Sequence, residues 1–223
     1  LFAAILRIPF AIIAPVILVI CAVGAYTVVM ASLLMFSGSI ADRFGRKRIL
    51  MLGVSIFTLG SLMCGLAPSI GFLIAARILQ AVGGSMMNPV AMSIITNTFT
   101  DPRERAQAIG VWGAVFGVSM ALGPILGGTL VSFVDWRAIF WVNIPVGLIA
   151  ILLTLRFIPE SNAPRPRRFD PIGQVLVLVM LASVTYGIIE GPNLGWTSTV
   201  ILGAFSASAL SLAGLVFYEP RRG

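Results

Sequence analysis

The sequence predicts an all-α membrane protein, a polytopic helical bundle with about seven full spans and a partial one at its N-terminal end. Of its 223 residues 58% are hydrophobic and only 10% are charged, whereas soluble domains carry roughly 25% charged residues. Its apolar runs are continuous, which favours membrane helices of about 20 residues over the short alternating strands of a membrane barrel. These observations exclude a soluble enzyme, a disordered chain and a collagen-like fibre.

Each expected span is an apolar run bounded by charged residues or by Gly and Pro. The full spans are expected near residues 17–40, 49–67, 70–97, 106–133, 138–158, 172–190 and 198–217. Residues 1–16 are also apolar, but Arg7, Pro9 and Pro15 interrupt them, so they are expected to be a remnant or an atypical first span. The chain opens on Leu1 without a signal-peptide pattern and is expected to be a fragment.

Basic residues fall almost entirely on one side of these spans. Twelve of the 15 Lys and Arg residues lie in loops near 41–48, 98–105, 156–171 and 219–223, and the other side holds only Arg137. Such an excess marks the cytoplasmic side, so we expect a multi-pass protein of the plasma (inner) membrane with these loops in the cytoplasm. The net charge of +7 then reflects topology, and no nucleic-acid partner is expected.

One arginine lies deep inside a predicted span. Arg77 is about eight residues, or roughly 12 Å, from the start of the span at 70–97. A charge near the bilayer centre costs about 2.5–3.5 kcal/mol even on insertion scales, and such charges usually face the bundle interior on a proton or ion pathway. Arg77, Gln80, Gly84 and Asn88 share one helix face. The alternative is an arginine that snorkels to the outer interface.

Small residues recur along the span at 106–133. The pairs Gly113-x-x-x-Gly117 and Gly123-x-x-x-Gly127 are of the kind that let helix backbones approach closely. Pro124 removes a backbone donor and can bend the helix. By spacing alone this pattern predicts generic helix packing.

The loop after the first full span is rich in charge. Asp42 lies where a helix is expected to end, a position that the helix dipole disfavours for a carboxylate. We therefore expect an arginine or the N-terminus of another helix to compensate it. The alternative is ordinary anchoring by cytoplasmic basic residues. The segment reads Gly38-Ser-Ile-Ala-Asp42-Arg43-Phe-Gly45-Arg46-Lys47-Arg48.

These segments resemble signatures of the major facilitator superfamily. The loop at 38–48 resembles the signature between its second and third spans, and Arg77-Ile-Leu-Gln80-Ala-Val-Gly83-Gly84 resembles that of its fourth span. The segment Gly123-Pro124-Ile-Leu-Gly127-Gly128 is similar to the fifth-span antiporter signature. Segments 136–147 and 190–196 are similar to those of fourteen-span drug:proton antiporters of the EmrB/QacA type. The patterns cover residues 25 to 200 in the expected order.

Some positions depart from the family pattern. Ser119 stands where the fifth-span signature has Gly, and Cys21 stands where members often have Trp, although Tyr26 matches. The family's acidic first span is missing or replaced by residues 1–16, so the resemblance names no coupling carboxylate. It implies that 17–158 form spans two to six, that 159–171 are a cytoplasmic linker and that 172–217 are an extra helix pair. The C-terminal bundle would be absent.

The resemblance implies a proton-coupled antiporter that exports hydrophobic or cationic drugs across the plasma membrane by alternating access. Arg77, Gln80 and Glu190 would serve proton coupling, although Glu190 could instead be a solvated carboxylate at a helix end. Gly38, Asp42, Arg43, Gly45, Arg46, Lys47 and Arg48 would form a cytoplasmic latch. Gly117, Gly123, Pro124, Gly127 and Gly128 would form an antiporter hinge. Tyr26, Asn88, Phe116 and Asn143 are expected to line the substrate cavity.

The expected partners are the lipid bilayer, protons, a small hydrophobic or cationic substrate and a periplasmic adaptor protein. No catalytic residue, cofactor or metal is predicted. An uptake symporter or a metabolite exporter of the same superfamily is an alternative, which the direction of the gradient would distinguish. A membrane-embedded enzyme or other non-transport subunit is a remote alternative, since it would want His ligands, clustered acids or Cys motifs. The chain alone is expected to be inactive in transport.

Overall fold

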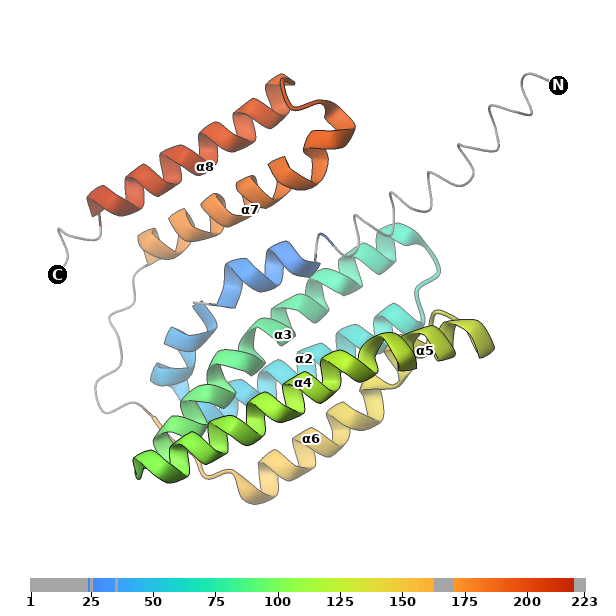
Figure 1. Ribbon diagram of the computed structural model, residues 1–223, viewed down its shortest axis with the longest axis vertical. Helices are drawn as coiled ribbons and strands as arrows, with labels where there is room; N and C mark the ends of the chain where they lie inside the picture. The colour runs from blue at the N-terminus through green and yellow to red at the C-terminus, as the bar shows by residue number, and fades with distance from the viewer. Residues whose placement is uncertain (1–23, 25, 35, 163–170, 219–223) are drawn as a thin grey trace.

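The computed structural model describes residues 24, 26–34, 36–162 and 171–218, and within these ranges the chain is helical without any strand. The helices are α2 (Arg46–Gly65), α3 (Ile70–Thr98), α4 (Pro102–Phe133), α5 (Ala138–Trp141), α6 (Asn143–Phe157), α7 (Pro171–Leu194) and α8 (Thr199–Tyr218). Two further segments, Tyr26–Leu34 and Phe36–Phe44, precede α2 and are bent by 51° relative to each other. Figure 1 shows α7 and α8 as a hairpin beside the bundle.

Six helices of the described residues are long and apolar enough to cross a membrane, or seven if the bent pair is one span. They follow the spans expected from the sequence, with α5 and α6 together forming the span at 138–157. The predicted all-α polytopic architecture is confirmed. The expected remnant at 1–16 lies outside the described residues.

One helix, α4, starts earlier than expected because a polar side chain caps it. The apolar run predicts a start at 106, but α4 begins at Pro102. The Asp101 carboxylate accepts hydrogen bonds from the backbone N–H groups of Arg103 at 2.9 Å and Glu104 at 3.1 Å. An N-cap acceptor followed by a proline in the first turn satisfies the free donors of a helix start. The helix therefore extends into the polar loop.

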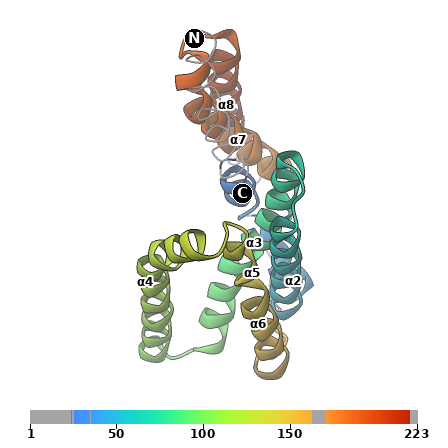
Figure 2. The ribbon, with the colours of Figure 1, turned by 90° about the vertical axis from the view of Figure 1, so that its right-hand side faces the viewer.

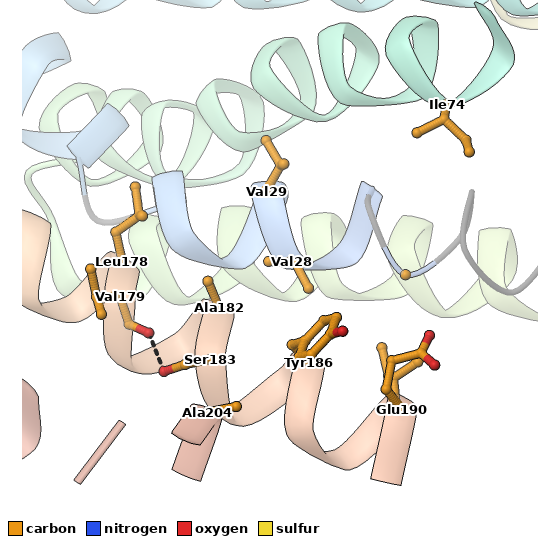
Figure 3. A pocket seen from close by; sticks show the side chains of 12 residues that line it. Val28, Val29, Ile74, Leu178, Val179, Ala182, Ser183, Tyr186, Glu190 and Ala204 are labelled. Carbon is orange, nitrogen blue, oxygen red and sulfur yellow. Dashed lines mark hydrogen bonds between the residues drawn. The ribbon is translucent and has the colours of Figure 1, made fainter. Parts of the chain in front are cut away.

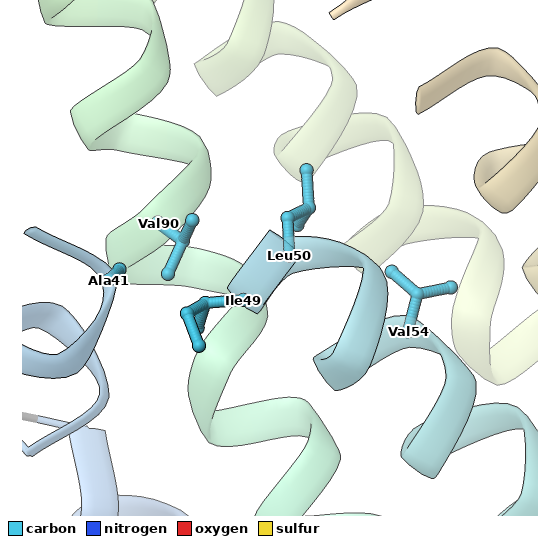
Figure 4. Packing of buried hydrophobic residues seen from close by; sticks show 5 residues of the cluster. All are labelled: Ala41, Ile49, Leu50, Val54 and Val90. Atoms are coloured by element: carbon cyan, nitrogen blue, oxygen red, sulfur yellow. The ribbon is translucent and has the colours of Figure 1, made fainter. Parts of the chain in front are cut away.

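The bundle is built on a close approach of α2 and α3. A Cβ on Gly83 of α3 would overlap the backbone nitrogen of Phe57 and lie 2.6 Å from the carbonyl oxygen of Gly53, both on α2. Only a residue without a side chain allows this approach. Toward the start of α2, a buried apolar cluster is formed by Ala41, Ile49, Leu50, Val54 and Val90 (Figure 4). The α6 helix also packs on α2, where Gly147 meets Thr58.

The α4 helix has no buried residue. It contacts α3 and α5, and Figure 2 shows it standing apart from α2 and α6. A Cβ at Gly113, Gly117, Gly123, Gly127 or Gly128 would meet nothing within 4 Å. The packing that their spacing predicts is thus not formed by residues that the structure describes.

The close contact of Gly83 with α2 can be tested by substitution. Gly83→Ala should destabilise the fold by about 1–3 kcal/mol, the usual cost of overpacking a tight contact. Gly71→Ala on the same helix is the matched control, because a Cβ there meets nothing within 4 Å, and it should leave stability unchanged or raise it. Thermal unfolding of both purified variants in detergent measures the difference. Equal melting temperatures for the two variants would contradict the close approach.

Candidate functional site

The Arg77 side chain points into the bundle. Its guanidinium carbon lies 4.3 Å from the centre of the Tyr26 ring and 5.7 Å from that of Phe140. Its Nη1 donates a hydrogen bond of 2.7 Å to Oε1 of Gln80, one helical turn further along α3. The residue is half-buried. Aromatic faces attract a guanidinium more strongly where water is excluded, so the two rings and the amide replace part of its lost hydration.

A chain of polar side chains continues from Gln80 into the core. Gln80 is 1% exposed, and its Nε2 donates to Oγ of Ser61 at 2.6 Å. Nδ2 of Asn143 donates to the same Ser61 oxygen at 3.4 Å. The Arg77 network, meaning Arg77, Gln80, Ser61 and Asn143, thus joins α3, α2 and α6. Ser61 is not predictable from the sequence, because a lone serine on an apolar helix has no spacing that marks it.

An apolar, aromatic cavity of about 420 Å³ lies next to this network. It brings together three of the four residues predicted to line a substrate cavity, namely Tyr26, Asn88 and Phe116. The fourth, Asn143, belongs to the Arg77 network instead. Trp112 stacks on Phe116 with a ring separation of 5.8 Å. The other lining residues are Met30, Leu50, Val54, Phe57, Gly84, Met87, Ala91, Ala150 and Thr154.

Tyr26 belongs to both features. The Arg77 guanidinium lies over its ring, and the same ring forms part of the cavity wall. A Cβ added to Gly84 would lie 3.1 Å from the Tyr26 hydroxyl, so the glycine in the polar stripe of α3 makes room for this tyrosine. The cavity and the Arg77 guanidinium therefore share one aromatic side chain.

The charged loop forms a compact structure at the start of α2. Nε and Nη2 of Arg46 donate to Oδ1 of Asp42 at 3.1 and 2.9 Å, which is the compensation by an arginine that the sequence predicts. Arg46 is only 9% exposed, and its buried Nη1 has no hydrogen-bond partner among the described residues. Gly45 adopts a φ of 108°, which favours glycine. Arg43 and Arg48 are exposed.

Glu160, which follows α6, completes this loop. Its Oε1 accepts from the backbone nitrogens of Lys47 at 3.1 Å and Ser161 at 3.2 Å, and its Oε2 lies 3.5 Å from Nε of Arg48. A Cβ on Gly45 would lie 2.6 Å from Oε1. The first turn of α2 contains no acidic residue, so this carboxylate supplies the negative charge that a helix N-terminus favours. Glu160 is not predictable from the sequence as part of this loop, because it lies more than a hundred residues away along the chain.

The remaining predicted residues lie elsewhere. Gly38 lies next to Pro89 of α3, and a Cβ on it would make an ordinary van der Waals contact of 3.8 Å. Pro124 lies inside α4, whose C-terminal part turns toward α5 in Figure 2. Glu190 is half-buried near the end of α7 and lines a second cavity, whose described walls include no residue of the Arg77 network.

Comparison with known proteins identifies relatives along most of the chain. A sequence model of the Major Facilitator Superfamily matches residues 5–221. The chain is 41% identical over 199 residues to "Multidrug resistance protein Stp" of Mycobacterium tuberculosis, covering 89% of this chain and 37% of that protein. It is 38% identical to "Methylenomycin A resistance protein" of Streptomyces coelicolor, covering 89% and 42%, and 37% identical to "Multidrug efflux pump LfrA" of Mycolicibacterium smegmatis, covering 89% and 39%.

The fold also matches a solved transporter. The POT family transporter PepTSo superposes with a TM-score of 0.60 at 16% identity, over 88% of this chain and 43% of that one. This likeness concerns the fold alone. The chain spans about two fifths of the length of the curated relatives it matches.

The Arg77 network predicts a coupled loss of stability. Gln80→Leu should destabilise the fold by about 1–3 kcal/mol, because the hydrogen bonds that Gln80 makes to Arg77 and Ser61 are lost. Ser61→Ala should cost less in the Gln80→Leu background than in the wild type, since the shared bond is already broken. Thermal unfolding of the single and double variants measures this coupling. Gln107→Leu, at an exposed site on α4, is the control, and strictly additive effects would contradict the network.

Proposed function

Because the chain belongs to the major facilitator superfamily, we propose that it contributes one helical bundle to a proton-coupled antiporter that exports hydrophobic or cationic compounds. Its relatives are named as drug-resistance and efflux proteins, which supports export of such compounds. The observation that carries the proposal is the Arg77 guanidinium, held inside the bundle on a tyrosine that also lines an aromatic cavity.

Aromatic walls suit this class of substrate. Tyr26, Trp112 and Phe116 offer large apolar faces, and each face also attracts a cation. The walls carry no acidic side chain among the described residues, so size and apolar surface select the compound rather than a fixed ion pair. Such a cavity accepts many hydrophobic cations and neutral compounds with similar affinity.

Arg77 provides the charge that links protons to substrate. A cation in the bundle lowers the proton affinity of any carboxylate brought close to it, and alternating access changes which groups approach it. Gln80 and Ser61 fix the guanidinium in place through the Arg77 network. Glu190 lies outside this network and stays a prediction as an accessory proton or cation site.

The loop around Asp42 and Arg46 acts as the cytoplasmic latch in this proposal. Arg43 in this loop is exposed and is the cation that an acceptor on a second bundle would engage. Glu160 ties the loop to the end of α6, so that the latch moves with the bundle as one body. Opening on the cytoplasmic side would then require only the contact with the second bundle to break.

The glycine face of α4 acts as the hinge. Gly117, Gly123, Gly127 and Gly128 leave open space along this helix, and Pro124 interrupts its hydrogen bonding. We place residues 17–158 in one bundle, 159–171 in a cytoplasmic linker and 172–217 in an additional helix pair. Residues 1–16 are assigned to an atypical or partial first span, and a periplasmic adaptor is a further partner.

Replacing Arg77 tests the proposed proton coupling. In the longest reading frame that contains this chain, Arg77→Ala should abolish dye export driven by an imposed proton gradient while leaving membrane insertion intact, because the charge that biases proton binding is lost. Arg103→Ala, at an exposed position of α4, should export normally. Efflux from vesicles and protein abundance measure the two effects. Unchanged efflux in Arg77→Ala would overturn the coupling role, and export with the opposite gradient dependence would indicate a symporter.

Removing one aromatic wall tests the cavity. Trp112→Ala should weaken apparent affinity for tetraphenylphosphonium by roughly threefold to tenfold, the size of a lost cation–π contact. Phe133→Ala on the same helix is the matched control, since that side chain is 86% exposed. The concentration dependence of export in vesicles gives both values. Equal weakening in the two variants would place the substrate outside this cavity.

A further inference from the structure

Arg137 connects the end of α2 to the segment that leads into α5. Its Nη2 donates a hydrogen bond of 3.2 Å to the carbonyl oxygen of Ala67, two residues beyond α2 and 70 positions away in the chain. Ala67 is 4% exposed, and a buried carbonyl needs a hydrogen-bond donor. None of the described residues in the last turn of α2 is basic. The Arg137 guanidinium therefore also supplies the positive charge that a helix C-terminus favours.

The neighbours of Arg137 hold its side chain in this position. Its Nη1 lies 3.5 Å from Oδ2 of Asp135, and its guanidinium carbon lies 4.4 Å from the centre of the Trp136 ring. A planar guanidinium that is already held by a carboxylate and an aromatic face loses little further freedom when it binds a carbonyl. Asp135 and Trp136 thus orient Arg137 for its bond to Ala67.

Trp141, the last residue of α5, makes a second contact with the end of α2. A Cβ on Gly65 would lie 2.7 Å from Nε1 and 3.0 Å from Cδ1 of the Trp141 ring, so the indole lies directly on this glycine. The α5 helix has four residues, and a helix this short has little stability of its own. The α5 anchor, meaning the contacts of Arg137 with Ala67 and of Trp141 with Gly65, therefore fixes where α5 lies.

Phe140 lies between the two anchoring residues in the sequence and faces the Arg77 network. Its ring centre is 5.7 Å from the Arg77 guanidinium carbon. It is 6.2 Å from the centre of the Trp136 ring, and the two rings are perpendicular. Edge-to-face pairs at this distance attract each other. Trp136 and Phe140 thus form a bridge of two aromatic rings between Arg137 and Arg77.

Neither cavity is lined by this segment. The described walls of the aromatic cavity include no residue of 135–141. Figure 3 shows the second cavity, whose described walls include Ile74 of α3 and Tyr186 of α7 but likewise none of 135–141. A substrate held in either cavity would therefore not touch Arg137 or Phe140, so any effect of these two residues on transport must pass through Arg77.

On the proposed topology the α5 anchor lies on the outer side of Arg77. The loop between α2 and α3 and the loop between α4 and α5 both face outward, and Arg77 lies about two helical turns inside the start of α3. Phe140 therefore approaches the Arg77 guanidinium from the outer side. The side chain of Arg137 is 42% exposed, so water can replace the Ala67 carbonyl as its partner. The bond can thus break and form again at low cost.

We propose that Arg137 is a positioning residue for the Arg77 site. Through the α5 anchor it holds the Phe140 ring against the outer side of the Arg77 guanidinium, which keeps outer water and ions from this cation. The bond from Arg137 to Ala67 breaks when the bundle opens outward and forms again when it closes. The inference rests on the proposed transport function, but the α5 anchor itself can be measured without transport.

A buried thiol beside the α5 anchor tests the positioning directly. Cys64 precedes Gly65 and is 0% exposed, so it reports whether α5 covers the end of α2. Right-side-out vesicles with the longest reading frame that contains this chain are treated with a membrane-impermeant, charged methanethiosulfonate. Peptide mass spectrometry then follows labelling of Cys64. Arg137→Gln should label roughly threefold to tenfold faster than the wild type, the size of a partly exposed hydrogen bond from a charged group.

Two further variants make the labelling result specific. Val134→Ala, at a position of the same outer loop that is 72% exposed, is the matched control and should label as slowly as the wild type. Gly65→Ala displaces the Trp141 ring and loosens the α5 anchor while Arg137 stays intact, so it too should label Cys64 faster. Labelling that neither Arg137→Gln nor Gly65→Ala accelerates would overturn the proposal.

Export separates positioning from substrate binding. Arg137→Gln and Phe140→Leu should each lower the maximal rate of tetraphenylphosphonium export roughly threefold to tenfold, the size of a lost cation–π contact, with apparent affinity unchanged. The double variant should be no slower than Phe140→Leu, because Arg137 acts through the position of that ring. Strictly additive losses, or a weakened apparent affinity, would overturn the positioning role. If the wild type exports nothing but labelling responds as expected, the transport proposal fails and the α5 anchor stands.

Discussion

The half-buried guanidinium of Arg77 is the constraint on which the centre of this bundle depends. A charge that enters the membrane must find substitutes for water, and here two aromatic rings and one amide provide them. Gln80 can be buried as the acceptor for Arg77 only because Ser61 accepts the hydrogen bond from its amide nitrogen. The chain of hydrogen bonds therefore runs from Gln80 of α3 to Ser61 of α2 and on to Asn143 of α6. The network that begins at this one cation thus links three helices.

The glycines of α2 and α3 make this arrangement geometrically possible. The hydrogen bond from Gln80 to Ser61 is short because the helices approach closely at Gly60, where a Cβ would lie 2.8 Å from the backbone of Gln80. In lipid the hydrophobic effect does not drive helices together, so close packing of small residues and interhelical hydrogen bonds must do so. Glycine contact and polar network are thus two parts of one interface.

The same chain also has large surfaces that its described residues leave uncovered. The α4 helix has no buried residue, and its Phe133 is 86% exposed. The matched relatives are more than twice as long as this chain. In a transporter that works by alternating access, contacts between bundles must form and break. Smooth glycine faces and single ionic contacts suit that task better than an interdigitated core.

Most of the fold was predictable from the sequence, because membrane spans depend on local composition. Long apolar runs, the asymmetry of basic residues and the lone intramembrane arginine are all visible along the chain, and so is the helical stripe that turns Arg77 inward. The residues that complete the site were not visible. Ser61, Trp112 and Glu160 carry no spacing signal, and Asn143 was expected in the cavity but bonds to Ser61 instead. Which partner a buried polar group finds depends on how helices distant in sequence are juxtaposed, and only the tertiary structure decides that.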